Sequence, residues 1–186
     1  MNSLVKLWRA EHRSFGALLG LLAEQLDLLA KGEAPNYEIM LDILDYMVDY
    51  ADRFHHPAED LVFAKVAERV PSARESVSDL MRQHIELVKI GRQLIGALEA
   101  AVHGTVTPRS TIEAQGSQYL DAFRRHMYAE EQGVFLTALE QLSSEDWNSI
   151  HREARRGEDP LFGERPQQRY AALRREISGT SDDSTR

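Results

Sequence analysis

Apolar residues recur at helical spacing over four long stretches of the chain, and no stretch has the strict apolar–polar alternation of a half-buried strand. Each stretch ends at residues that commonly terminate helices, such as Gly32 and Pro71. The predicted helices cover about residues 3–31, 36–70, 72–103 and 108–142. The pattern therefore predicts an all-helical protein.

Short polar residues predict where two of these helices begin. Ser72 followed by Glu75 fits a capping box for the third helix, in which the two side chains bond each other's backbone N–H groups. The fourth helix has two candidate starts, the dipeptide Thr107-Pro108 and the pair Ser110 and Glu113. Each connection between the long helices is therefore short.

Four helices of this length with short connections can only lie antiparallel to their chain neighbours. The expected fold is an antiparallel up-down-up-down four-helix bundle over residues 1–142. Residues 143–177 are expected to form a short C-terminal helical appendage, in which Ser143 and Asp146 cap a helix to about residue 156. Its apolar residues fit packing across the bundle or against another subunit. Residues 178–186 are small and polar and predict a disordered tail.

Composition narrows the classes of function. The 186 residues suit one core with an appendage, and the net charge of -8 argues against nucleic acid as a partner. There is no cysteine, so a metal would need His, Asp, Glu or Tyr as ligands. The first residues lack an apolar signal segment and no apolar run is long enough for a membrane span, so we expect a cytoplasmic protein, either monomer or homodimer.

The most informative feature is a repeated order of metal-binding residue types on four different helices. A histidine is followed 43 or 42 residues later by a second histidine, and a glutamate follows the second histidine by four residues. The two sets are His12, His55 and Glu59, and His84, His126 and Glu130. Residues four apart on a helix project from one face, about 40° and 6 Å apart. Imidazoles and carboxylates in a bundle suit a pair of divalent ions such as Fe, Mn or Zn.

A single His-to-Glu pair would carry little information, because acidic residues occupy 30 of 186 positions and such pairs also form ordinary helix-surface contacts. His56 with Asp60 is a third pair of this kind. The apolar positions of that helix align with His55, whereas polar residues align with His56. We therefore expect His55 and Glu59 to face the core, and His56, Asp60 and their counterpart Glu131 to face outward.

His12 and His84 each stand within an apolar stripe, where a lone histidine is more often a packed core residue than a ligand. Burying several histidines and glutamates at one level would cost several kcal/mol unless a cation neutralised them. A metal is the more economical interpretation. His103 and His151 lack this pattern and are expected to be solvated.

The arrangement H…HxxxE…H…HxxxE, with His-His-Pro-Ala-Glu-Asp at 55–60 and His-Met-Tyr-Ala-Glu at 126–130, resembles the hemerythrin-like, or HHE cation-binding, proteins over about residues 4–142. The resemblance implies a non-haem di-iron centre whose two ions are bridged by carboxylates. It also allows an additional oxo or hydroxo bridge, and Mn or Zn in place of iron. The ligands it implies by position are terminal imidazoles at His12, His55, His84 and His126 and bridging carboxylates at Glu59 and Glu130.

The chain departs from the oxygen-carrying hemerythrins, whose third helix supplies a second histidine where this sequence has Leu80 and Val88. That departure leaves coordination positions for water, an exogenous ligand or another side chain. Asp52 is the leading extra candidate for a direct ligand, with two alternatives: it accepts a hydrogen bond from a ligand imidazole, or it faces a boundary of the core. Pro57 predicts a local kink or a widened helical turn beside the ligands. Tyr119, Tyr50 and Tyr128 are weaker candidates, since tyrosines at helical spacing usually pack.

The resemblance implies a protein that binds or processes a small ligand such as O2, NO or peroxide. It leaves open a sensing or carrier module without turnover and an enzyme of peroxide, nitric oxide or iron oxidation chemistry. An iron donor in repair of iron centres is a further alternative, although such proteins often carry a cysteine-bearing N-terminal domain. A helical scaffold without a metal is the simplest competing interpretation.

Overall fold

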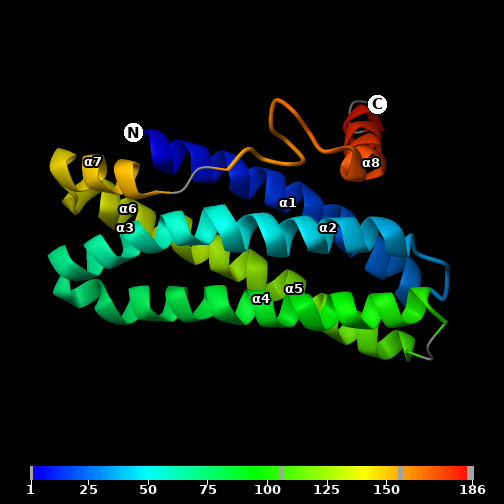
Figure 1. The fold of residues 1–186 in the computed structure, drawn as a ribbon. Coiled ribbons are helices and arrows are strands. Elements are labelled where there is room, and N and C mark those ends of the chain that lie inside the picture. Colours follow the sequence, from blue (N-terminus) through cyan, green and yellow to red (C-terminus); the bar gives the residue numbers. More distant parts are fainter. Residues whose placement is uncertain (1, 105–106, 155–156, 184–186) are drawn as a thin grey trace.

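All regular elements are helical in the computed structural model, which describes residues 2–104, 107–154 and 157–183 (Figure 1). The α-helices are α1 (Ser3–Ala30), α2 (Tyr37–Tyr50), α3 (His56–Arg69), α4 (Arg74–Val102), α5 (Arg109–Ala129), α6 (Phe135–Gln141), α7 (Ser144–Glu153) and α8 (Ala171–Asp183). Two π-helical segments, η1 (Ala51–His55) and η3 (Glu130–Val134), and two 3-10 turns, η2 (Pro71–Ala73) and η4 (Gln168–Tyr170), complete the elements. The predicted all-helical class is confirmed.

The long helices form rods that lie side by side in Figure 1, with the chain turning back at each short connection. One rod is α1, one is α2 continued through η1 into α3, one is α4, and one is α5 continued through η3 into α6. Adjacent rods pack directly: α4 contacts α5 and α2, and α1 contacts α5. Apolar side chains of all four rods meet in two clusters, one near each end. The polar site lies between these clusters.

Helix starts follow local hydrogen bonding, but not always as the sequence predicts. At Ser143 and Asp146 the predicted capping box is present, with both reciprocal bonds formed. The capping box predicted for Ser72 and Glu75 is wrong, because Ser72 lies inside the 3-10 turn η2 and no side chain caps α4. Helix α5 begins after Pro108 without a side-chain cap, so the proline rather than Ser110 marks its start.

The C-terminal segment packs across the bundle. Helix α7 contacts α3, and its Trp147 and Ile150 belong to the same apolar cluster as Trp8 and Phe63. Helix α8 contacts α1 and α2. It extends to Asp183, so part of the segment expected to be a disordered tail is described as helix, and residues 184–186 lie outside the described residues. Within the described part of the chain, no helix is both long and apolar enough to cross a membrane.

Two π-helical turns interrupt the rods beside the candidate ligands. Around Pro57 the structure has a widened turn, one of the two outcomes expected there, because a proline ring cannot accommodate the carbonyl of residue 53 in a regular α-helix. The His56 N–H instead bonds the carbonyl oxygen of Ala51, five residues back. The second π-turn begins at Glu130, where no proline predicts it. Each such turn inserts a residue into the helical repeat, so it changes which side chains face the core.

Gly91 marks a close approach between helices. A Cβ built there would lie 2.7 Å from Val48 Cγ2 and 3.1 Å from Tyr119 Cε2, so this glycine serves close packing. We expect Gly91→Ala to lower the free energy of unfolding by about 1–3 kcal/mol. Gly96→Ala, on the same helix with nothing within 4 Å, is the control and should stabilise the protein by about 0.5–1 kcal/mol. Urea unfolding of the metal-free proteins measures both, and equal stabilities for the two variants would contradict the packing role.

Candidate metal centre

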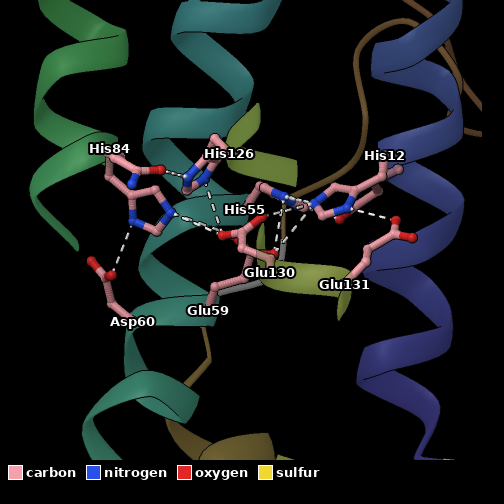
Figure 2. Close-up of polar contacts among 10 residues, drawn as sticks. His12, His55, Glu59, Asp60, His84, His126, Glu130 and Glu131 are labelled. Carbon is pink, nitrogen blue, oxygen red and sulfur yellow. Dashed lines mark hydrogen bonds and ion pairs between the residues drawn. The ribbon is translucent and has the colours of Figure 1, made fainter. Parts of the chain in front are cut away.

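The structure brings the six predicted residues together from all four rods (Figure 2). Each of them is at most 5% exposed, and both glutamates are fully buried. Histidine Nε2 atoms point toward the two carboxylates, and Glu130 lies between His84 on one side and His12 on the other. The site therefore has an inner face of nitrogen and oxygen atoms that is closed to bulk water.

The two glutamates each approach histidines from both sets. Glu59 lies 3.2 Å from His55 Nε2 through Oε1 and 3.8 Å from His84 Nε2 through Oε2. Glu130 lies 3.4 Å from His12 Nε2 through Oε2, and its Oε1 lies 3.0 Å from His126 Nε2. A carboxylate with one oxygen toward each set of imidazoles has the geometry of a bridging ligand.

On its outer side, each of the four histidines offers Nδ1 to a side-chain oxygen. The acceptor atoms are Glu131 Oε1 for His12 (2.9 Å), Glu11 Oε2 for His55 (2.7 Å), Asp60 Oδ1 for His84 (3.0 Å) and Gln83 Oε1 for His126 (3.1 Å). An imidazole that donates through Nδ1–H presents a lone pair at Nε2. The outer hydrogen bonds therefore orient four lone pairs toward the interior.

Part of this donor set lacks a hydrogen-bond partner on the inner side, although His84 Nε2 lies 3.3 Å from Glu130 Oε1. Nε2 of His12 and Nε2 of His55 face each other at 3.2 Å, although both are acceptors when their Nδ1 atoms donate outward. Both oxygens of Glu59, Oε2 of Glu130 and Nε2 of His126 are buried without a hydrogen-bond partner. Buried polar atoms in such an arrangement are costly unless a cation lies among them. Neutral imidazole nitrogens with carboxylate oxygens suit Fe, Mn or Zn, so the residues present fit a metal centre.

The electrostatics of the cluster also fit a metal centre. Burial, together with the neighbouring His55, lowers the pKa of His12 to about 4, so its imidazole is neutral near pH 7. Burial and the adjacent Glu130 raise the pKa of Glu59 well above its usual value. Burial acts on Glu130 in the same sense, but the surrounding imidazoles outweigh it and lower that pKa. Two adjacent carboxylates thus compete for one charge, and bound cations would stabilise the ionised form of both.

His56 does not face outward as expected. It is 4% exposed, both of its ring nitrogens lack a partner, and its ring stacks on that of His84 with centroids 4.1 Å apart and an angle of 14°. The π-turn η1 accounts for the error, because its extra residue turns both His55 and His56 inward. One ligand atom from each of His56, His84 and His126 lies within 4.8 Å of the others. Parallel rings cannot both aim in-plane lone pairs at one ion, so we do not count His56 among the ligands.

The extra candidates have other roles. Asp52 is exposed and lies 4.0 Å from Arg92, so the interpretation of Asp52 as a ligand or imidazole acceptor is wrong. Tyr119 is buried against Phe123, as expected for a packing residue. Tyr50 donates its hydroxyl to Glu11, which in turn accepts from His55. Leu80, which stands where oxygen-carrying hemerythrins have a histidine, is buried in an apolar cluster and offers no ligand atom.

Outside the cluster, His103 is exposed, as expected. His151 is only partly exposed, and its Nε2 lies 3.1 Å from the hydroxyl of Ser3.

The outer acceptors were only partly visible in the sequence. Asp60 and Glu131 were expected to lie outside the core, and they do lie on the outer side, but their contacts with histidines of other rods were not predicted. Glu11 and Gln83 were missed. A usable signal exists, since each directly precedes a histidine of the motif and so stands beside the site on the next face of its helix.

A buried group of imidazoles and carboxylates between four helical rods defines a helical metal-binding protein. The family model of the hemerythrin HHE cation binding domain matches residues 3–138, which is more than half of the chain. The chain therefore belongs to this family. No curated protein and no solved structure matched it.

Proposed function

We propose that this protein holds a non-haem di-iron centre in an antiparallel four-helix bundle and binds or processes a small ligand such as O2, NO or peroxide. The convergence of four histidine Nε2 atoms on two buried, shared carboxylates is the observation that supports it. Membership of a cation-binding family supports metal binding in general. The choice of iron and of the ligand is our inference from the donor set.

The proposed ligands divide into two halves. His12 and His55 would hold one ion, His84 and His126 would hold the other, and Glu59 and Glu130 would serve both. Two iron ions would supply electron transfer and open coordination positions for a small ligand. The side chains exclude bulk water through burial and hold the imidazoles in one tautomer through the outer hydrogen bonds.

A direct test uses the full-length protein loaded with Fe(II) without oxygen and then exposed separately to O2, peroxide, NO and azide. The expected result is a visible absorption change that differs between ligands and is absent from His84→Ala. His103→Ala, an exposed histidine at the end of α4, is the matched control and should behave as the unmodified protein. Turnover of peroxide or NO would identify an enzyme, and reversible spectra without turnover a carrier or sensor. Spectra equal to those of free iron would overturn the proposal.

His56 is placed to contact an exogenous ligand. It lines a surface cavity of about 350 Å3 together with His84 and Asp60, and its ring nitrogens have no other partner. Burial and the neighbouring His84 lower the pKa of His56 well below its usual value, so it is neutral. A neutral imidazole would be able to donate one hydrogen bond to a small ligand held next to His84.

We expect His56→Phe, which keeps a ring at this position, to retain both ions. Its affinity for azide should fall about 10–100-fold, because a hydrogen bond to a charged ligand contributes about 1.5–3 kcal/mol. Ligand titration of the iron-loaded protein followed by absorption measures the effect. Loss of an ion would instead make His56 a metal ligand, and unchanged ligand affinity would exclude any contact with the ligand.

A further inference from the structure

The outer hydrogen bonds follow a local repeat that relates the two halves of the centre. The residue before the first histidine of each set accepts from the second histidine of that set: Glu11 from His55, and Gln83 from His126. The residue after the glutamate of each set accepts from the first histidine of the other set: Asp60 from His84, and Glu131 from His12. The halves are therefore built alike, except where the acceptor residues differ in kind.

One of these differences changes the charge. In the half that contains His12 and His55, both imidazoles donate to carboxylates, Glu131 and Glu11. In the half that contains His84 and His126, one imidazole donates to the carboxylate of Asp60 and the other to the neutral amide of Gln83. The first half therefore carries one more negative charge next to its ion position than the second half.

Glu11 is also held more firmly than its counterpart. Tyr50 donates its hydroxyl to Glu11 Oε1 at 2.8 Å while His55 Nδ1 lies 2.7 Å from Oε2, so each carboxylate oxygen accepts from a different donor. Burial and the adjacent Glu11 raise the pKa of Tyr50, which keeps its hydroxyl protonated as a donor. At the same distance in sequence, five residues before His126, stands the exposed Asp121, which has no hydroxyl to donate. The Tyr50–Glu11 pair thus belongs to one half alone.

A carboxylate acceptor makes an imidazole a stronger ligand, because it stabilises positive charge on the ring, and its own charge attracts the cation. We infer that the two ion positions differ in affinity: the His12/His55 half binds the first divalent ion, and the His84/His126 half holds the more weakly bound, exchangeable one. This inference rests on the proposed two-ion centre and adds an order of filling. It assigns Glu11 and Gln83 as positioning residues that set this order.

Two conservative exchanges test it, because each makes the halves equal in charge. Glu11→Gln leaves one carboxylate and one amide acceptor in both halves, and Gln83→Glu leaves two carboxylates in both. The double exchange reverses the original difference. Co(II) titration of the full-length, metal-free protein, followed by its absorption bands, gives two stepwise dissociation constants for each protein.

Changing an outer partner alters metal affinity by about 10–100-fold, so we expect Glu11→Gln to weaken the tighter step by that factor and Gln83→Glu to strengthen the weaker step. Either single exchange narrows the ratio of the two constants, and the double exchange restores it. His56 is unchanged in all four proteins, so its effect cancels. Circular dichroism of the metal-free variants checks that each one folds.

The half that fills first is identified by removing one histidine from each half. His126→Ala should keep the tighter Co(II) step and His55→Ala should lose it, whereas in the double-exchange background the two results should be reversed. The inference would be overturned if neither single exchange changed the ratio of the two dissociation constants. It would also be overturned if the first ion stayed with the same histidines in the double exchange. A parent protein that binds no Co(II) would instead overturn the proposed function.

Discussion

Glu130→Gln is expected to lower the affinity for transition metal ions by more than about 100-fold and to leave at most one ion bound, since even a change in an outer partner costs about 10–100-fold. Glu130 is fully buried and approaches three imidazoles, those of His12, His84 and His126. An amide removes the negative charge and replaces one acceptor oxygen with a donor NH2 group that points at the same lone pairs.

The matched control for this exchange is Glu131→Gln, one residue further along the chain. Its side chain is 31% exposed and only orients His12, so we expect both ions to remain with a loss of about 10-fold in affinity. Competition against a chromophoric chelator gives both affinities. Two ions bound by Glu130→Gln at the affinity of the unmodified protein would rule out its bridging role.

Metal loading should stabilise the fold strongly. A ligand that binds only the folded state at 1,000 times its dissociation constant contributes about 4 kcal/mol, which for a chain of this length corresponds to a rise in Tm of roughly 8–16 °C. The rise is expected because the metal-free cluster buries unpartnered acceptors and two competing carboxylates.

Differential scanning calorimetry with and without Fe(II) or Zn(II) measures this shift. His84→Ala should retain less than half of it, because one ion position loses a ligand. Excess chelator should return the unmodified protein to the lower Tm. Equal melting temperatures with and without metal would show that the cluster is satisfied without cations.

The helical rods and the six clustered residues could be predicted from the sequence for the same reason. Helical periodicity accumulates over long stretches, and a repeated spacing on four rods constrains several side chains to one level. The orientation of His56 could not be predicted in this way, because the π-turn shifts the helical phase by one residue just before His56. The prediction that Asp52 binds a metal or orients an imidazole is wrong for the same reason, because Asp52 lies in this π-turn.

Helical periodicity could not predict the hydrogen bonds between rods. Asp60 contacts His84 and Glu131 contacts His12 across different helices, and such pairs depend on the relative height and rotation of the rods. Spacing within one chain does not determine those quantities. The charge difference between Glu11 and Gln83 is plain in the sequence, but it acquires meaning only once their partners are known.

The most direct test of the two-ion centre is metal content combined with X-ray absorption on the full-length protein reconstituted with Fe(II) and freed of excess metal. We predict two ions per chain, nitrogen and oxygen neighbours, and a metal–metal scattering path of roughly 3.5–4 Å, as in other two-metal sites. Fewer than two ions per chain, or two ions without a short metal–metal path, would contradict the account.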